Sequence, residues 1–65
     1  MEKNKWFCVV LWDNWADNTI VADRNFDTIE QALSYIENVK KHSIGLKIEL
    51  REYAENEGYV TRMTI

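Results

Sequence analysis

An uninterrupted apolar run, Trp-Phe-Cys-Val-Val-Leu-Trp at residues 6–12, constrains the fold more than any other part of the chain. Apolar side chains occupy both alternating sets of positions in it, and aromatic and β-branched types are frequent. A strand of this kind is covered on both faces, so we expect it in the interior of a sheet. The run is far too short to cross a bilayer, which takes about 20 apolar residues as a helix, and we predict no membrane partner.

The length of 65 residues predicts a single domain over residues 1–65. A domain this small buries only about 60% of the surface that its unfolded chain exposes, so its stability is marginal. The lone cysteine, Cys8, cannot form an internal disulfide, and with His42 as the only histidine a four-ligand structural zinc site is not expected. We therefore predict a cytoplasmic protein without cofactors, stabilised by close packing or by oligomerisation.

Two segments of the chain have the pattern of β-hairpins. Turn-forming residues at 13–18 separate the apolar run from a second expected strand at residues 19–24. In the other half, apolar and charged residues alternate over 46–51, a turn is expected at 55–58, and alternation resumes over 59–65. Each segment predicts a pair of antiparallel strands.

A helix is expected between the two hairpins. Asp27 followed by Glu30 predicts a capping box at its start. One apolar stripe then recurs at helical spacing, at Ile29, Ala32, Leu33, Ile36 and either Val39 or Lys40. His42 falls in the last turn, where positive charge opposes the helix dipole, and Gly45 suits the left-handed conformation that ends helices. The elements predict an α+β fold, a small ββαββ domain whose four-stranded antiparallel sheet, in the order 2-1-3-4, has one helix packed on one face.

The residues that could carry catalysis have structural explanations. Cys8 lies inside an apolar strand, where burial raises the pKa of a thiol and lowers its reactivity. His42 is expected to cap the helix rather than to act as a base. The aspartates that could pair for acid–base chemistry all lie in or beside turns, at Asp13, Asp17, Asp23 and Asp27. We predict that the protein is not an enzyme.

The placement of the aromatic residues is the most informative feature for function. If Phe7, Val9 and Leu11 pack against the helix, their alternate neighbours lie on the other face of the sheet, which one helix cannot cover. An uncovered apolar patch rimmed by charge is typical of an interface, and we expect Thr19 and Val21 to extend it. The predicted partner-binding residues are Trp6, Val10, Trp12, Trp15, Arg51 and Tyr53.

Two alternatives stay open for the tryptophans. Trp6 and Trp12 could instead tuck under loops, which would give an ordinary small core. Trp15, in the Asn- and Asp-rich loop, either folds back on the first strand or contacts a partner.

The sequence thus predicts a small acidic binding protein that acts through a protein–protein interface on the open sheet face. We expect a homodimer, with a protein partner that is a second copy or another protein, in the role of an accessory protein, a regulator or an inhibitor of the type that phages and other mobile elements often encode. The alternative is a module that stacks single-stranded nucleic acid on the sheet-face aromatics. Eleven acidic residues against eight basic ones make nucleic acid the less favoured partner.

Overall fold

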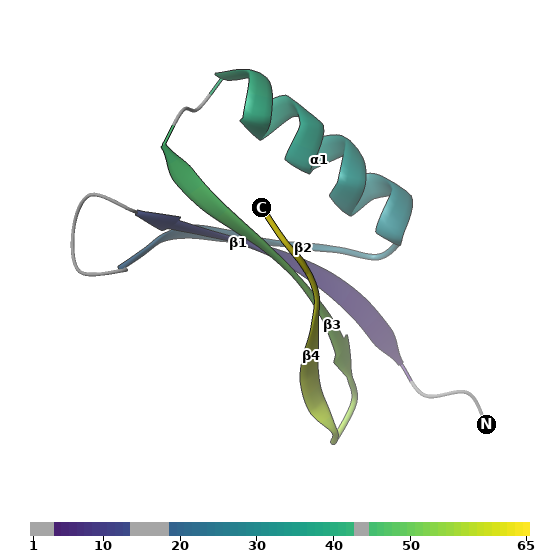
Figure 1. The fold of residues 1–65 in the computed structure, drawn as a ribbon. Helices are drawn as coiled ribbons and strands as arrows, with labels where there is room; N and C mark the ends of the chain where they lie inside the picture. The colour runs from purple at the N-terminus through teal and green to yellow at the C-terminus, as the bar shows by residue number, and fades with distance from the viewer. Residues whose placement is uncertain (1–3, 14–18, 43–44) are drawn as a thin grey trace.

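The computed structural model describes residues 4–13, 19–42 and 45–65. The elements are β1 (Lys5–Asp13), β2 (Ile20–Phe26), α1 (Ile29–His42), β3 (Leu46–Ala54) and β4 (Gly58–Thr64). The strands form one antiparallel sheet in the order β2-β1-β3-β4, and α1 lies across one of its faces (Figure 1). This arrangement confirms the predicted α+β fold and strand order. None of the helical residues described here forms a segment long and apolar enough to span a membrane.

The apolar run occupies the centre of the sheet, as its composition predicts. In β1, Cys8, Val9, Val10 and Leu11 are all buried, with at most 7% of any of them exposed. β1 pairs with β3 over its whole length and with β2 over residues 7–12, which places it inside the sheet. The core on the helix side consists of Val9, Leu11, Ala32, Ile36, Val39, Ile48 and Leu50.

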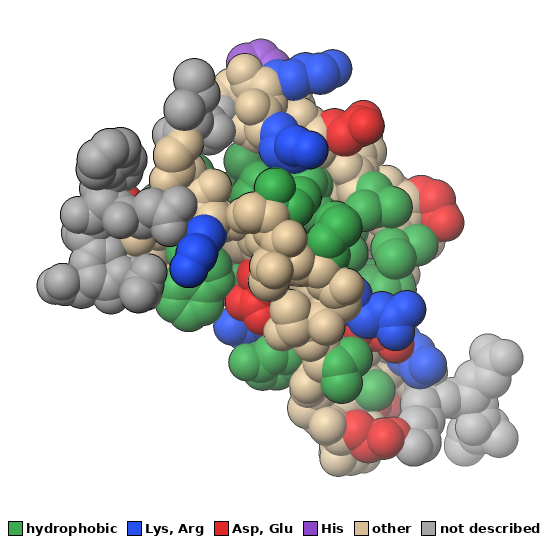
Figure 2. Space-filling model, viewed as in Figure 1, with side chains coloured by type: hydrophobic (Ala, Val, Ile, Leu, Met, Phe, Trp, Pro, Cys, Tyr) green, Lys and Arg blue, Asp and Glu red, His purple; other side chains and the backbone are tan. Residues whose placement is uncertain are grey.

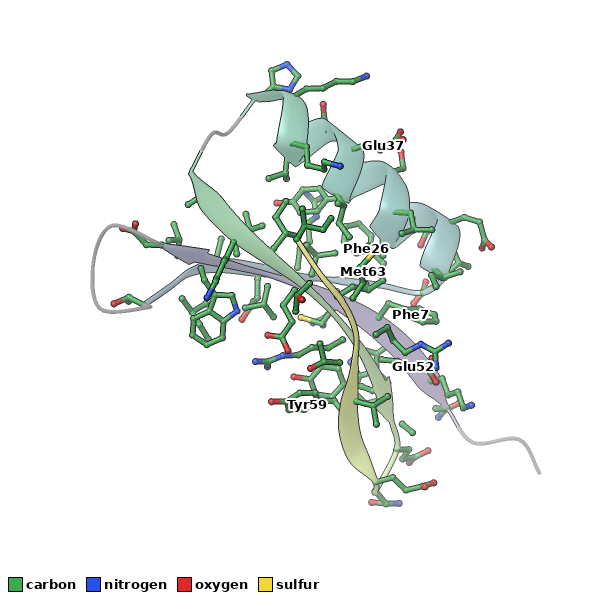
Figure 3. All side chains as sticks on the ribbon, viewed as in Figure 1. Phe7, Phe26, Glu37, Glu52, Tyr59 and Met63 are labelled. Atoms are coloured by element: carbon green, nitrogen blue, oxygen red, sulfur yellow. The ribbon has the colours of Figure 1, made fainter. Side chains whose placement is uncertain are left out.

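Partly buried side chains complete this core at its margin. Phe7, Phe26 and Met63 pack against it from three different strands (Figure 3). Leu33, which the helical spacing predicts in the apolar stripe, lies at the flank of α1 and is 40% exposed. Elsewhere on the surface in view, hydrophobic side chains form small groups between acidic and basic ones (Figure 2).

The start of α1 differs from its prediction by one residue. The Thr28 hydroxyl accepts a hydrogen bond of 3.2 Å from the Gln31 backbone N–H. In return, Gln31 Oε1 accepts from the backbone N–H groups of Asp27 and Thr28. The capping box is therefore Thr28 with Gln31, and the prediction of Asp27 with Glu30 is wrong, because both pairs have the same spacing and only the packed helix selects between them.

The other end of the helix matches the sequence pattern. His42 Nδ1 lies 2.9 Å from the Asn38 carbonyl oxygen, to which its N–H donates. Gly45 has a φ of 91°, in the left-handed region that favours glycine. His42 thus serves as a capping residue at the end of α1, as expected.

A β-bulge changes the alternation of β2. Leu11 lies opposite Ala22, but the next residue of β1, Trp12, lies opposite Ile20, so Val21 has no directly opposed partner. Opposed residues of antiparallel strands share a face, which puts Ile20 beside Trp12 on the face away from α1. The expectation that Thr19 and Val21 also extend that face stays a prediction, because neither residue has a directly opposed partner in the register of β1 and β2.

Candidate interface on the open sheet face

The face of the sheet opposite α1 carries a connected group of aromatic and charged side chains. They come from β1, β3 and β4, and the strand register aligns them, with Trp6 opposite Tyr53 and Tyr53 opposite Tyr59. We call this group the open-face cluster; its members are Trp6, Trp12, Glu49, Arg51, Tyr53, Tyr59 and Thr61.

Glu49 is the centre of the open-face cluster. Its Oε1 accepts a hydrogen bond of 3.2 Å from the Trp12 indole N–H, and its Oε2 accepts one of 2.7 Å from the Thr61 hydroxyl. The Arg51 Nε atom lies 3.0 Å from the same Oε2 as an ion pair, without the alignment of a hydrogen bond. One carboxylate thus links β1, β3 and β4.

The electrostatics keep this ion pair charged. Burial alone would raise the pKa of Glu49, but the contacts from Arg51, Thr61 and Trp12 outweigh it and leave that pKa below its usual value. The contact with Glu49 in turn raises the pKa of Arg51. Both side chains are largely shielded from water, at 13% and 14% exposed, so solvent screens their attraction only in part.

The aromatic half of the open-face cluster is held by Arg51. The guanidinium carbon lies 4.2 Å from the centre of the Tyr59 ring, a cation–π contact, and one of its N–H groups donates to the Tyr53 hydroxyl at 3.2 Å. The Tyr53 ring stacks on Trp6 with centroids 5.5 Å apart and packs at 5.1 Å against Tyr59, which is labelled in Figure 3. Each ring is therefore fixed by at least one neighbour.

The structure brings together four of the side chains predicted to bind a partner. Trp6 stacks on Tyr53, Tyr53 accepts from Arg51, and Glu49 connects Arg51 to Trp12. Trp6 and Trp12 are both half-buried, so they are neither enclosed in a core nor fully exposed as an interface patch.

The remaining two predicted residues are placed differently. Val10 belongs to the same face but is only 1% exposed, so it supports the surface from beneath. Trp15 lies outside the described residues. Cys8, next to Val10 on this face, is 5% exposed, and burial together with the charge of Asp23 raises the pKa of its thiol, as expected from its strand position.

Sequence reasoning did not select Glu49, Tyr59 or Thr61 as site residues. The alternation of residues 46–51 places Glu49 on the open face, but a glutamate at such a position usually indicates a side chain exposed to solvent. Tyr59 and Thr61 join the cluster only through the register of the β3–β4 hairpin, which is set by its turn. Positive φ values of 64° at Asn56 and 76° at Gly58 define that turn.

A shallow groove of about 400 Å³ adjoins the open-face cluster. It is lined by residues of three strands and the C-terminal residue: Trp12, Lys47, Ile48, Glu49, Thr64 and Ile65. Its surface is mostly apolar, and Glu49 contributes a charged group to it. A side chain of a partner can fill a depression of this kind. Within the described residues, no three His, Cys, Asp or Glu side chains are grouped as metal ligands.

Comparison of the chain with protein-family models, with curated proteins and with solved structures finds no match. Fold and surface together define a class, a small ββαββ domain in which a helix covers one face of the sheet and no other described helix or strand covers the second face.

Proposed function

We propose that the chain is a non-enzymatic binding protein whose open-face cluster forms a homodimer interface. The observation that carries this proposal is the composition of the uncovered face. Trp12, Trp6, Tyr53, Tyr59 and Arg51 are of the residue types that contribute most binding energy when an interface desolvates them. A domain of this kind fits the role of a cytoplasmic accessory protein that regulates or inhibits another protein.

The fixed positions of these side chains support the proposal further. Association costs conformational entropy for every long side chain that it immobilises, roughly 0.5–1.5 kcal/mol each. Here stacking holds Trp6 and Tyr53, and hydrogen bonding holds Trp12 and Glu49. Folding of the monomer therefore already restricts these side chains, and association loses less conformational entropy.

The charges of the open face favour a second copy as the partner. The whole chain has a net charge of −3, which makes two copies repel each other weakly. On this face, however, acidic Asp23 and Glu49 are balanced by basic Lys47 and Arg51, so two such faces meet without a net repulsion. The sheet is four strands wide and its long strands extend about 30 Å, a plane of on the order of 500 Å², near the lower limit for a specific dimer.

The same contacts give less support to a single-stranded nucleic acid as the ligand. A stacking platform needs free ring faces and uncompensated positive charge. Trp6 and Tyr53 stack on each other, the Arg51 guanidinium lies over Tyr59, and Glu49 neutralises Arg51. Protein association therefore fits this surface better.

Sedimentation velocity over a range of micromolar concentrations tests the proposal. We expect the wild type to sediment as a dimer and Trp12→Lys as a monomer with an unchanged helix signal by circular dichroism. Leu33→Lys is the matched control, because it adds the same charge at an exposed apolar residue of α1, and it should remain a dimer. A monomeric wild type, or a dimer that survives both Trp12→Lys and Tyr59→Lys, would show that the open face is not the interface.

A further inference from the structure

A second surface lies on the opposite side of the sheet, between β2 and α1. It is a groove of about 420 Å³, lined by Arg24 and Phe26 from β2 and by one side of α1. The helical residues that line it include Gln31, Tyr35, Asn38 and Lys41, which recur at helical spacing. The groove follows the outer edge of β2, which pairs with no strand in the described parts of the chain.

Arg24 is the distinctive group in this groove. Its guanidinium carbon lies 5.8 Å from the centre of the Phe26 ring and 5.6 Å from that of Tyr35, and the two rings pack at 5.3 Å. The rings hold the cation in place, yet none of the described acidic residues forms an ion pair with Arg24, in contrast to Arg51 and Arg62. Its planar set of N–H donors is suited to a carboxylate.

The local charge of the groove is positive although the chain is acidic. Glu37 is the acidic residue that lines it, and Lys41 stands four residues further along α1, the spacing at which opposite charges offset each other on a helix. No other acidic residue among those described lines the groove to offset the positive charge of Arg24. The groove therefore complements an acidic side chain.

The edge of β2 offers backbone groups to an incoming strand. Every residue of β2 except Phe26 is exposed, with Ile20 44% and Val21 55% exposed. An added strand pairs through its backbone and directs every second side chain towards one face of the sheet. Arg24 lies opposite Val9 of the core, so its side chain is on the α1 side, where the side chains of an added strand would enter the groove.

A second copy of this chain is a poor occupant of that edge. Two copies of β2 that paired about the middle of the strand would set Arg24 against Arg24, or Asp23 against Asp23. Like charges directly opposed across strands are destabilising. The charges of β2 thus select a different chain as the partner.

We propose that the edge of β2 and the β2–α1 groove bind an extended segment of a partner protein, which adds a strand beside β2 and places a carboxylate side chain against Arg24. The apolar part of the groove, at Phe26 and Tyr35, takes a neighbouring side chain of the same segment. This site is separate from the open-face cluster, so the protein can dimerise through one surface and bind a partner through the other.

Selection from a phage-displayed library of random dodecapeptides tests this proposal with the full chain as bait. We expect enriched peptides to be rich in strand-forming residues and to share one Asp or Glu, and amide chemical shifts to change along β2 and α1 when such a peptide is added. Arg24→Glu should weaken binding about tenfold or more, because an attraction becomes a repulsion. Arg24→Gln, which keeps size and polarity, should weaken it less and guards against a folding defect.

Arg62→Glu is the matched control, since it makes the same charge change on the other edge strand, β4, and should leave peptide affinity unchanged. Trp12→Lys should also bind the peptide normally, which separates this site from the proposed dimer interface. The proposal is overturned if no peptide is enriched, if enriched peptides lack a shared acid and bind Arg24→Glu as well as wild type, or if the shifts map to the open-face cluster.

Discussion

Glu49 joins three strands through a single carboxylate, which makes it the residue with the clearest energetic role. The contacts with Trp12, Arg51 and Thr61 keep its pKa below its usual value. A carboxylate whose pKa is lowered by folding stabilises the folded state above its unfolded pKa. That contribution is lost as the pH falls through the folded value.

We therefore predict that Glu49→Gln loses about 1–2 kcal/mol of unfolding free energy at neutral pH. The amide has a single acceptor oxygen, so it keeps the hydrogen bond from only one of Trp12 and Thr61, and it leaves Arg51 without its counter-ion. The difference between wild type and variant should shrink as the pH falls from the ordinary glutamate pKa of 4.5 through the lower folded value, because the wild-type carboxyl becomes neutral over that range. Urea unfolding at a series of pH values measures this, and a constant difference would contradict it.

The reactivity of Cys8 reports on how well the open face is closed, because Cys8 lies buried beneath it. Its thiol is 5% exposed and its pKa is raised, so a thiol reagent should modify it only when the sheet opens. We expect its reaction with an aromatic disulfide reagent at neutral pH to be at least about a hundredfold slower than in denaturant. Arg51→Ala should accelerate the reaction, since Arg51 lies opposite Cys8 on β3. Equal rates for native and denatured protein would contradict the burial of this face.

At the scale of elements, the first turn of α1 depends on a reciprocal pair of hydrogen bonds. Thr28→Ala removes the acceptor of the Gln31 N–H and should lower the free energy of unfolding by about 1 kcal/mol. Asp27→Ala should cost less, because the Asp27 carboxylate hydrogen-bonds to none of the residues described and loses only its attraction to the helix dipole. Thermal unfolding of the two variants measures the difference. A larger loss for Asp27→Ala would restore Asp27 as the cap.

The elements themselves could be predicted from the sequence because each has its own hydrophobic period. Apolar and charged residues alternate over 46–51, as in a strand with one buried face. The apolar residues of α1 recur every three or four positions, and the run at 6–12 is apolar at every position. The cap could not be assigned with certainty, since Asp27 with Glu30 and Thr28 with Gln31 have the same spacing. Nor does any local pattern mark the bulge at Val21, which depends on how β2 pairs with β1.

The candidate site was predictable in part for a related reason. Alternation along β1 and β3 places Trp6, Trp12, Arg51 and Tyr53 on one face, and the structure brings them together. The contacts that connect them cross between strands, and these depend on register rather than on the sequence of any one strand. Glu49 and Tyr59 are therefore found only when the strands are paired.

In the whole molecule, the sheet has two faces, and the described part of the chain supplies a covering layer, α1, for one of them. The helix-side core buries Val9 and Leu50 almost completely, at 0% and 2% exposed, while among residues 4–13, 19–42 and 45–65 the other face is closed by side chains of its own strands. A domain of this length has a stability of roughly 3–10 kcal/mol, so covering the second face adds a substantial fraction of the total. A dimer through that face would supply the second layer.

Dimerisation through the open face would couple folding to protein concentration by mass action. If two folded copies associate and unfolded chains do not, dimerisation stabilises the folded state more at higher protein concentration. The melting temperature of the wild type and of Leu33→Lys should therefore rise with concentration in the micromolar range, whereas that of Trp12→Lys should stay constant. Scanning calorimetry at several concentrations measures this. A wild-type melting temperature that does not change with concentration would mean that the side chains of the open-face cluster suffice to close this face in the monomer, and that their fixed arrangement serves stability rather than association.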